Sequence, residues 1–108
     1  MTLEELRKQI DVLDRQLVDL LSQRAETALE AGRLKVSTDL PIYEPAREKI
    51  IYENVRAANK GPLPDIELIH IFERIVDVMR ALQKNELASQ RQAQAVGAGQ
   101  EPETGSRQ

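Results

Sequence analysis

Charged side chains interrupt the apolar face of a helical pattern near the start of this chain. Leu3, Leu6, Ile10, Leu13, Leu17 and Leu20 follow one another at spacings of three and four, and the same spacing continues through Arg24, Ala28, Ala31 and Lys35. On a helix, Arg24 and Lys35 would therefore share one face about 16 Å apart, with only small residues between them. This arrangement predicts a cavity with positive ends.

The cations on this face also have an ordinary structural interpretation. Arg24 would then extend its head group to water or pair with a glutamate of a partner chain, and Lys35 would sit near a helix C-terminus. Arg and Lys are rarely buried without a partner, so the spacing alone leaves both interpretations open.

Further polar residues lie beside apolar positions later in the chain. Arg47 precedes Ile51 by one turn, and Glu48 lies next to Arg47 and four residues after Glu44. A solvated surface of charges four residues apart explains Glu44 and Glu48 equally well. Gln83 follows Ile69, Phe72, Val76 and Met79 on one face, where it either sets the pairing of helices or directs an amide into the same cavity.

The residue types that are missing exclude other chemistry. The chain has no cysteine and a single histidine, His70, which excludes a thiolate nucleophile, a cysteine-ligated metal site and a histidine cluster. His70 falls off the apolar face and is predicted to be structural or exposed. We therefore expect no metal site of these kinds.

The positions of Pro and Gly predict three helices, long, short and long. Thr2 and Glu5 form a capping-box pattern, and the first proline is Pro41. Pro45 suits the first position of a second helix, and a third begins near Asp65. No stretch shows the period of two that is typical of strands. The fold class is all-α, with a helical domain over residues 1–88 and a polar, disordered C-terminal tail over 89–108.

The first helix is too long to pack within one small domain. Carried from residue 3 to about Val36, it would span roughly 50 Å, whereas a compact domain of this size has a radius of gyration of about 13 Å. Its leucines would remain in water unless a partner helix covers them. The sequence predicts an intertwined homodimer. Arg7 lies about 25 Å from Arg24 along the helix and cannot share a pocket with Arg24 of its own chain, but an antiparallel partner helix could bring it there.

Composition narrows the class of protein further. Eighteen acidic residues against fifteen basic ones argue against a nucleic-acid binder. Apolar runs are too short for a transmembrane helix or a signal peptide. We expect a soluble cytoplasmic protein.

Taken together, these residues resemble the all-α chorismate mutases. The resemblance covers residues 3–86 and rests on short segments at joint spacing: 6–11 (LRKQID), 20–24 (LLSQR), 31–35 (AGRLK), 43–48 (YEPARE), and Ile71-Phe72 leading to Leu82-Gln83. It implies a cofactor-free Claisen rearrangement of chorismate to prephenate, in phenylalanine and tyrosine biosynthesis, by an intertwined dimer with two equivalent pockets. It also allows for a partner enzyme of aromatic biosynthesis.

The resemblance assigns a role to each candidate residue. Lys35 and Gln83 would donate hydrogen bonds to the ether oxygen, and Glu48 would accept one from the ring hydroxyl. Arg24, Arg47 and the partner subunit's Arg7 would bind the two carboxylates. Glu44 and Met79 stand where some relatives have an aspartate and a small hydroxyl residue. A methionine cannot donate a hydrogen bond, so one polar contact of those relatives would be missing here.

The chemistry of this reaction suits the residue types. A unimolecular rearrangement requires no nucleophile, but it requires a flexible dianion to be held in its reactive conformer. Negative charge grows on the ether oxygen as its bond breaks, so preorganised donors there stabilise the transition state.

Two other functions remain open. An isochorismate pyruvate-lyase shares the fold and also binds a dianionic ether, and Glu48 together with Gln83 favours the mutase. A dimeric helical interaction or regulatory module would instead pair Arg24, Lys35 and Gln83 within the protein and leave no cavity.

Overall fold

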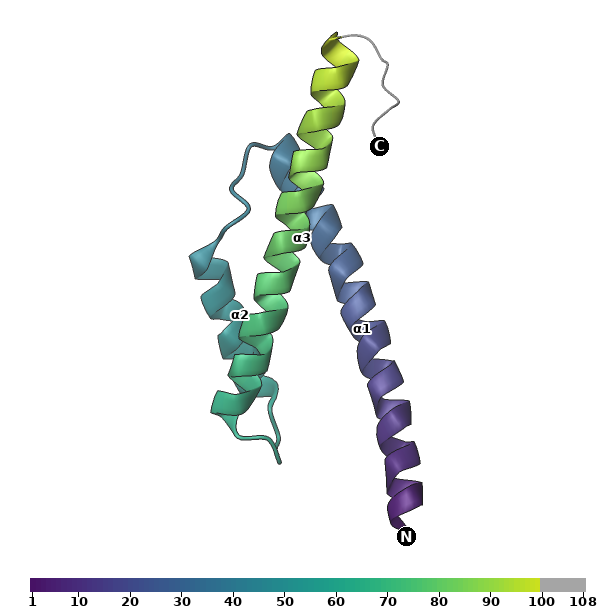
Figure 1. The fold of residues 1–108 in the computed structure, drawn as a ribbon. Helices are drawn as coiled ribbons and strands as arrows, with labels where there is room; N and C mark the ends of the chain where they lie inside the picture. Colours follow the sequence, from purple (N-terminus) through teal and green to yellow (C-terminus); the bar gives the residue numbers. More distant parts are fainter. Residues whose placement is uncertain (100–108) are drawn as a thin grey trace.

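The computed structural model describes residues 1–99, with the side chains of residues 1–93. Within this range the chain forms three α-helices and no strand: α1 (Leu3–Ser37), α2 (Pro45–Ala58) and α3 (Asp65–Gly99) (Figure 1). The predicted all-α fold with a long, a short and a long helix is confirmed.

α1 begins at the predicted capping box. The Thr2 hydroxyl accepts a hydrogen bond from the Glu5 backbone at 3.1 Å, and the Glu5 carboxylate accepts one from the Thr2 backbone at 2.8 Å. These bonds lower the pKa of Glu5, the one from the Thr2 backbone most. With no proline before Pro41, the helix runs for 35 residues. It ends where the Thr38 hydroxyl donates to the Leu34 carbonyl at 2.7 Å.

A side chain in the second connection is hydrogen-bonded to the start of α3. α2 starts with Pro45 at its first position, as predicted, and ends at Ala58. Asn59 then donates to the Leu63 carbonyl at 2.8 Å and to the Asp65 carboxylate at 2.7 Å. Asp65 is the first residue of α3, so this bond links the connection to the helix.

α3 is longer than the sequence pattern indicates, since it continues through Gly99. Alanine, glutamine and arginine dominate residues 89–96, and these residues favour a helix even without an apolar face to bury. Residues 100–108 of the predicted tail lie outside the described residues. The domain boundary at residue 88 stays a prediction.

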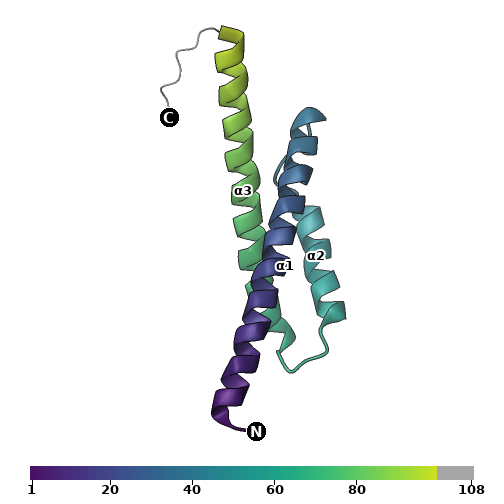
Figure 2. The same ribbon diagram turned by 90° about the vertical axis from the view of Figure 1, so that its right-hand side faces the viewer.

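α3 forms the centre of the arrangement and contacts both α1 and α2. Figure 1 shows α2 and the N-terminal half of α1 on different sides of α3, with that half of α1 running away from it. Figures 1 and 2 both show the C-terminal end of α3 extending past the end of α1. The buried residues lie where the helices meet: Gly32, Ile69, Val76, Met79 and Gln83.

The molecule is elongated, as the length of α1 predicts. Its extents are 64 × 34 × 16 Å and its radius of gyration is 19.2 Å, against about 13 Å for a compact chain of this size. None of the described helices is both long enough and apolar enough to cross a membrane.

Candidate active site

A cavity of about 390 Å³ lies among the three helices and has the size of a small-molecule site. Its lining contains every sequence-predicted site residue except Arg7. The lining consists of Arg24, Thr27, Ala28, Ala31, Lys35, Ile42, Glu44, Arg47, Glu48, Ile51, Val76, Met79, Arg80 and Gln83.

α1 supplies one wall of this cavity. Arg24, Ala28, Ala31 and Lys35 all line it, so the face of α1 that the spacing predicts is the one that borders the cavity. Among the residues with described side chains, Arg24 and Arg47 form no ion pair. Their guanidinium groups are therefore available to an anionic ligand.

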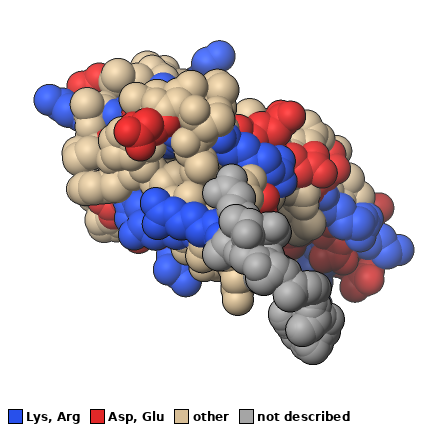
Figure 3. Space-filling model, turned by 90° about the horizontal axis from the view of Figure 1, so that it is seen from above, with Lys and Arg blue, Asp and Glu red and all other residues tan. Residues whose placement is uncertain are grey.

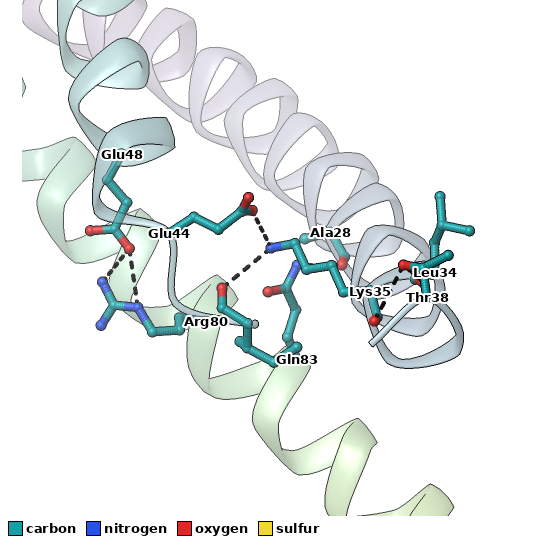
Figure 4. A network of polar contacts seen from close by, with 9 residues as sticks. Ala28, Leu34, Lys35, Thr38, Glu44, Glu48, Arg80 and Gln83 are labelled. Carbon is teal, nitrogen blue, oxygen red and sulfur yellow. Dashed lines mark hydrogen bonds and ion pairs between the residues drawn. The ribbon is translucent and has the colours of Figure 1, made fainter. Parts of the chain in front are cut away.

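Lys35 is held by the segment that joins α1 to α2. Its Nζ lies 2.8 Å from the Glu44 carboxylate and donates to the Ile42 carbonyl at 3.3 Å (Figure 4). The Lys35 side chain is 18% exposed, so these contacts compensate a largely buried charge. An ammonium group has three donors, and two partners leave one donor for a ligand.

Gln83 is almost completely buried, with 8% of its surface exposed. Its Nε2 donates to the Ala28 carbonyl at 2.7 Å, which ties the amide to α1 (Figure 4). Gly32 permits this approach, because a Cβ there would lie 2.9 Å from Cγ of Gln83. One N–H of the amide is thus used within the protein, and the second remains for a ligand.

Glu48 on α2 is paired with Arg80 on α3. Nε and Nη2 of Arg80 both donate to Oε2 of Glu48, with Nε at 3.1 Å. The guanidinium also lies over the Tyr43 ring, 4.8 Å from its centroid. The hydrogen bond to Glu48 is the main reason why the pKa of Arg80 is raised. Sequence reasoning missed Arg80, although its position three residues before Gln83 puts it close to that face of α3.

The remaining candidates differ in their position. Met79 is buried at 7% exposure and borders the cavity with a side chain that cannot donate a hydrogen bond. Arg7 lies on the exposed N-terminal half of α1 and is not part of the lining. His70 is exposed, 3.9 Å from a Glu67 oxygen, and lies outside the cavity. Within the described part of the chain, no group of three or more His, Cys, Asp or Glu side chains is arranged to hold a metal ion.

The cavity is positively charged although the chain is not. Four cations (Arg24, Lys35, Arg47 and Arg80) face two carboxylates (Glu44 and Glu48), which leaves +2 in a protein of net charge −3. On the face seen in Figure 3, basic and acidic side chains are interspersed. The local excess suits a ligand that carries two negative charges.

The pKa of Tyr52, which is not part of the lining, is also shifted. Burial raises the pKa of Tyr52, and the nearby carboxylates of Glu48, Glu73 and Asp77 raise it further. Tyr52 therefore stays neutral and adds no charge next to Glu48.

Comparison with known proteins identifies relatives of most of the helical region. A family model described as chorismate mutase type II matches residues 6–84. A bifunctional chorismate mutase/prephenate dehydratase of Aquifex aeolicus is 38% identical over 86 residues, which are 76% of this chain and 24% of that protein. The chain thus spans about a quarter of the length of the bifunctional relatives it matches.

Relatives of similar length to this chain also match. A chorismate mutase of Methanocaldococcus jannaschii is 35% identical over 86 residues, covering 79% of this chain and 87% of that protein. The crystal structure of chorismate mutase from Helicobacter pylori in complex with prephenate superposes with a TM-score of 0.73 at 35% identity, covering 80% and 93% of the two chains. With more than two thirds of its length matched, this chain belongs to the chorismate mutase type II family.

Proposed function

We propose that this protein is a chorismate mutase, which converts chorismate to prephenate without a cofactor. The observation that carries the proposal is the +2 cavity with an amide in its wall, in a chain of this family. In this rearrangement the ether C–O bond breaks while a C–C bond forms within the same molecule. No proton or group is transferred to the protein, so binding and electrostatics must provide the catalysis.

The charges of the cavity suggest how the substrate is held. Arg24 and Arg47, which form no ion pair among the described side chains, would bind carboxylates of the dianion. The spare donors of Lys35 and Gln83 would stabilise charge on the ether oxygen as it grows in the transition state. Glu48 would accept a hydrogen bond from the ring hydroxyl.

Glu44 and Met79 stand where some relatives have other residues, and both would border the substrate. Glu44 would lie near the substrate while it keeps its ion pair with Lys35. Met79 would contact the substrate through van der Waals packing, since its thioether offers no donor.

We also propose that the active protein is an intertwined homodimer. The leucine-rich face of α1 is exposed in the single chain, which is costly for so much apolar surface. Exposed residues on it include Leu3 (61%), Ile10 (54%), Leu13 (56%), Leu17 (57%) and Leu20 (60%). An antiparallel second α1 would cover them and bring the partner subunit's Arg7 to the cavity.

The function is tested by adding chorismate to the purified protein without cofactor or metal and following its ultraviolet absorbance. Loss of chorismate with prephenate as the product is expected. An unchanged trace, with salicylate formed from isochorismate instead, would establish the lyase. If neither substrate reacts and a chorismate analogue does not raise the melting temperature, the protein is an interaction module.

Three further expectations accompany this proposal. The bifunctional relatives are named for a mutase joined to a prephenate dehydratase, which favours a partner enzyme that consumes prephenate. A cytoplasmic location is proposed for an enzyme of amino acid biosynthesis, and cell fractionation tests it. Residues 89–108 are proposed to lie outside the catalytic domain.

A further inference from the structure

The ion pair between Arg80 and Glu48 connects α3 to α2 inside the cavity. Two nitrogen atoms of Arg80 donate to the same oxygen, Oε2. Oε1 receives no hydrogen bond from any described residue. One oxygen of Glu48 is thus fixed by the protein, and the other is left for a donor on a ligand.

Arg80 is itself held in place from two further sides. Its guanidinium lies over the ring of Tyr43, and its Nη1 is 3.5 Å from a carboxylate oxygen of Asp77, one turn earlier on α3. Only 23% of the Arg80 side chain and 18% of the Glu48 side chain are exposed. A guanidinium with these contacts is less free to turn toward an incoming carboxylate than Arg24 or Arg47.

The pair also changes the charge that the substrate meets. A lone carboxylate in the cavity wall would repel a dianion, and partial burial would increase that repulsion. Paired with Arg80, Glu48 contributes an acceptor oxygen as part of an ion pair that has little net charge. An acceptor of this kind can bind a neutral hydroxyl while the two carboxylates of the ligand bind elsewhere.

We propose that Arg80 is a positioning residue of this site: it holds Oε2 of Glu48 so that Oε1 faces the ring hydroxyl of the substrate, and it offsets the charge of Glu48. This inference rests on the proposed function. Arg80 acts through Glu48 and does not touch the reacting atoms. Its effect should therefore depend on the hydroxyl of the substrate.

The test compares chorismate with an analogue that keeps the allyl vinyl ether and both carboxylates but lacks the ring hydroxyl. Arg80→Met should lower kcat/KM for chorismate by about 10- to 100-fold, the usual effect of losing a hydrogen bond to a charged group. With the analogue, the same variant should keep only the loss caused by the uncompensated charge of Glu48, so its loss should be clearly smaller than with chorismate. Arg80→Lys keeps one charged donor and should restore part of the activity with chorismate.

The chain offers a matched control for these variants. Arg33 forms an ion pair with Glu86 between α1 and α3, at 3.2 Å and outside the cavity. Arg33→Met removes an interhelical arginine in the same way and should leave the kinetics of both substrates unchanged. Thermal unfolding shows whether each variant is folded. If Arg80→Met is not folded, Arg80→Lys replaces it in the comparison of the two substrates.

A double-mutant cycle provides the second measurement. If Arg80 acts through Glu48, then adding Arg80→Met to Glu48→Ala should cause little further loss with chorismate. Equal losses with chorismate and the analogue, additive losses in the cycle, or full activity of Arg80→Met would each overturn the inference. A wild-type protein that does not convert chorismate would instead overturn the proposed function on which the inference rests.

Discussion

Among individual residues, the four cations of the cavity fall into two classes. Lys35 and Arg80 are paired with carboxylates, and Arg24 and Arg47 have no ion-pair partner among the described side chains. An anion can bind the second class without displacing a protein carboxylate. The paired cations are instead held by protein groups, and for Lys35 a fixed position suits a donor aimed at charge that develops only in the transition state.

This division predicts a specific effect of replacing Lys35. Lys35→Ala removes the donor proposed for the ether oxygen, so kcat should fall by about 10²–10³ while the oligomeric state is unchanged. Steady-state kinetics and size-exclusion chromatography check this. Lys84→Ala, at an exposed position on α3 outside the cavity, is the control and should keep full activity. Near-normal turnover of Lys35→Ala would exclude its proposed role.

Among the helices, the contact between α1 and α3 depends on a glycine. Gly32 is buried inside α1, in its last two turns, and within a helix glycine costs up to about 1 kcal/mol relative to alanine. The close approach of Gln83 explains why a side chain is absent there. The position of the amide in the cavity is therefore set by the opposite helix.

Adding a single methyl group at residue 32 tests whether Gly32 sets the position of the Gln83 amide. In Gly32→Ala the new Cβ would lie 2.9 Å from Cγ of Gln83, so the amide must shift. We expect kcat to fall about tenfold, while the melting temperature changes little because better helix propensity opposes the clash.

A Gln83→Ala background provides the control for this prediction. With the amide already removed, Gly32→Ala should have almost no additional effect on kcat. If the two losses simply multiply, Gly32 does not act through Gln83.

At the scale of the whole molecule, a single chain leaves much of the apolar face of α1 uncovered. Apolar residues are exposed along most of α1, and Arg7 lies on that same exposed half. Both facts have one explanation if a second chain packs against α1. A symmetric dimer would then contain two sites, each drawing on both subunits.

Mixing of inactive variants tests these shared sites. Arg7→Ala and Arg24→Ala chains, each inactive alone, should form heterodimers with one intact site, so random exchange should restore about a quarter of wild-type activity. Chorismate turnover after confirmed subunit exchange is the measurement. Arg24→Ala mixed with Lys35→Ala is the control, because both residues belong to the same chain's half of a site and no intact site results. Absence of rescue in the first mixture would reject the contribution of Arg7 across the interface.

Local signals in the sequence predicted the starts of the helices well. The capping box at Thr2 and Glu5 and the proline at residue 45 act within one turn, so they do not depend on the rest of the fold. The length of α3 was underestimated because residues 89–99 lack an apolar face, although the Ala, Gln and Arg among residues 89–96 favour a helix.

The sequence by itself determined the three helices and placed Arg24, Ala28, Ala31 and Lys35 along one cavity wall, because helical periodicity fixes which residues share a face. Only the tertiary structure decided that Glu48 pairs with Arg80, that Lys35 pairs with Glu44, and that Gln83 reaches Ala28 past Gly32. Most of these contacts join residues from different helices. Their distances depend on how the helices cross, which is set by packing rather than by spacing along the chain.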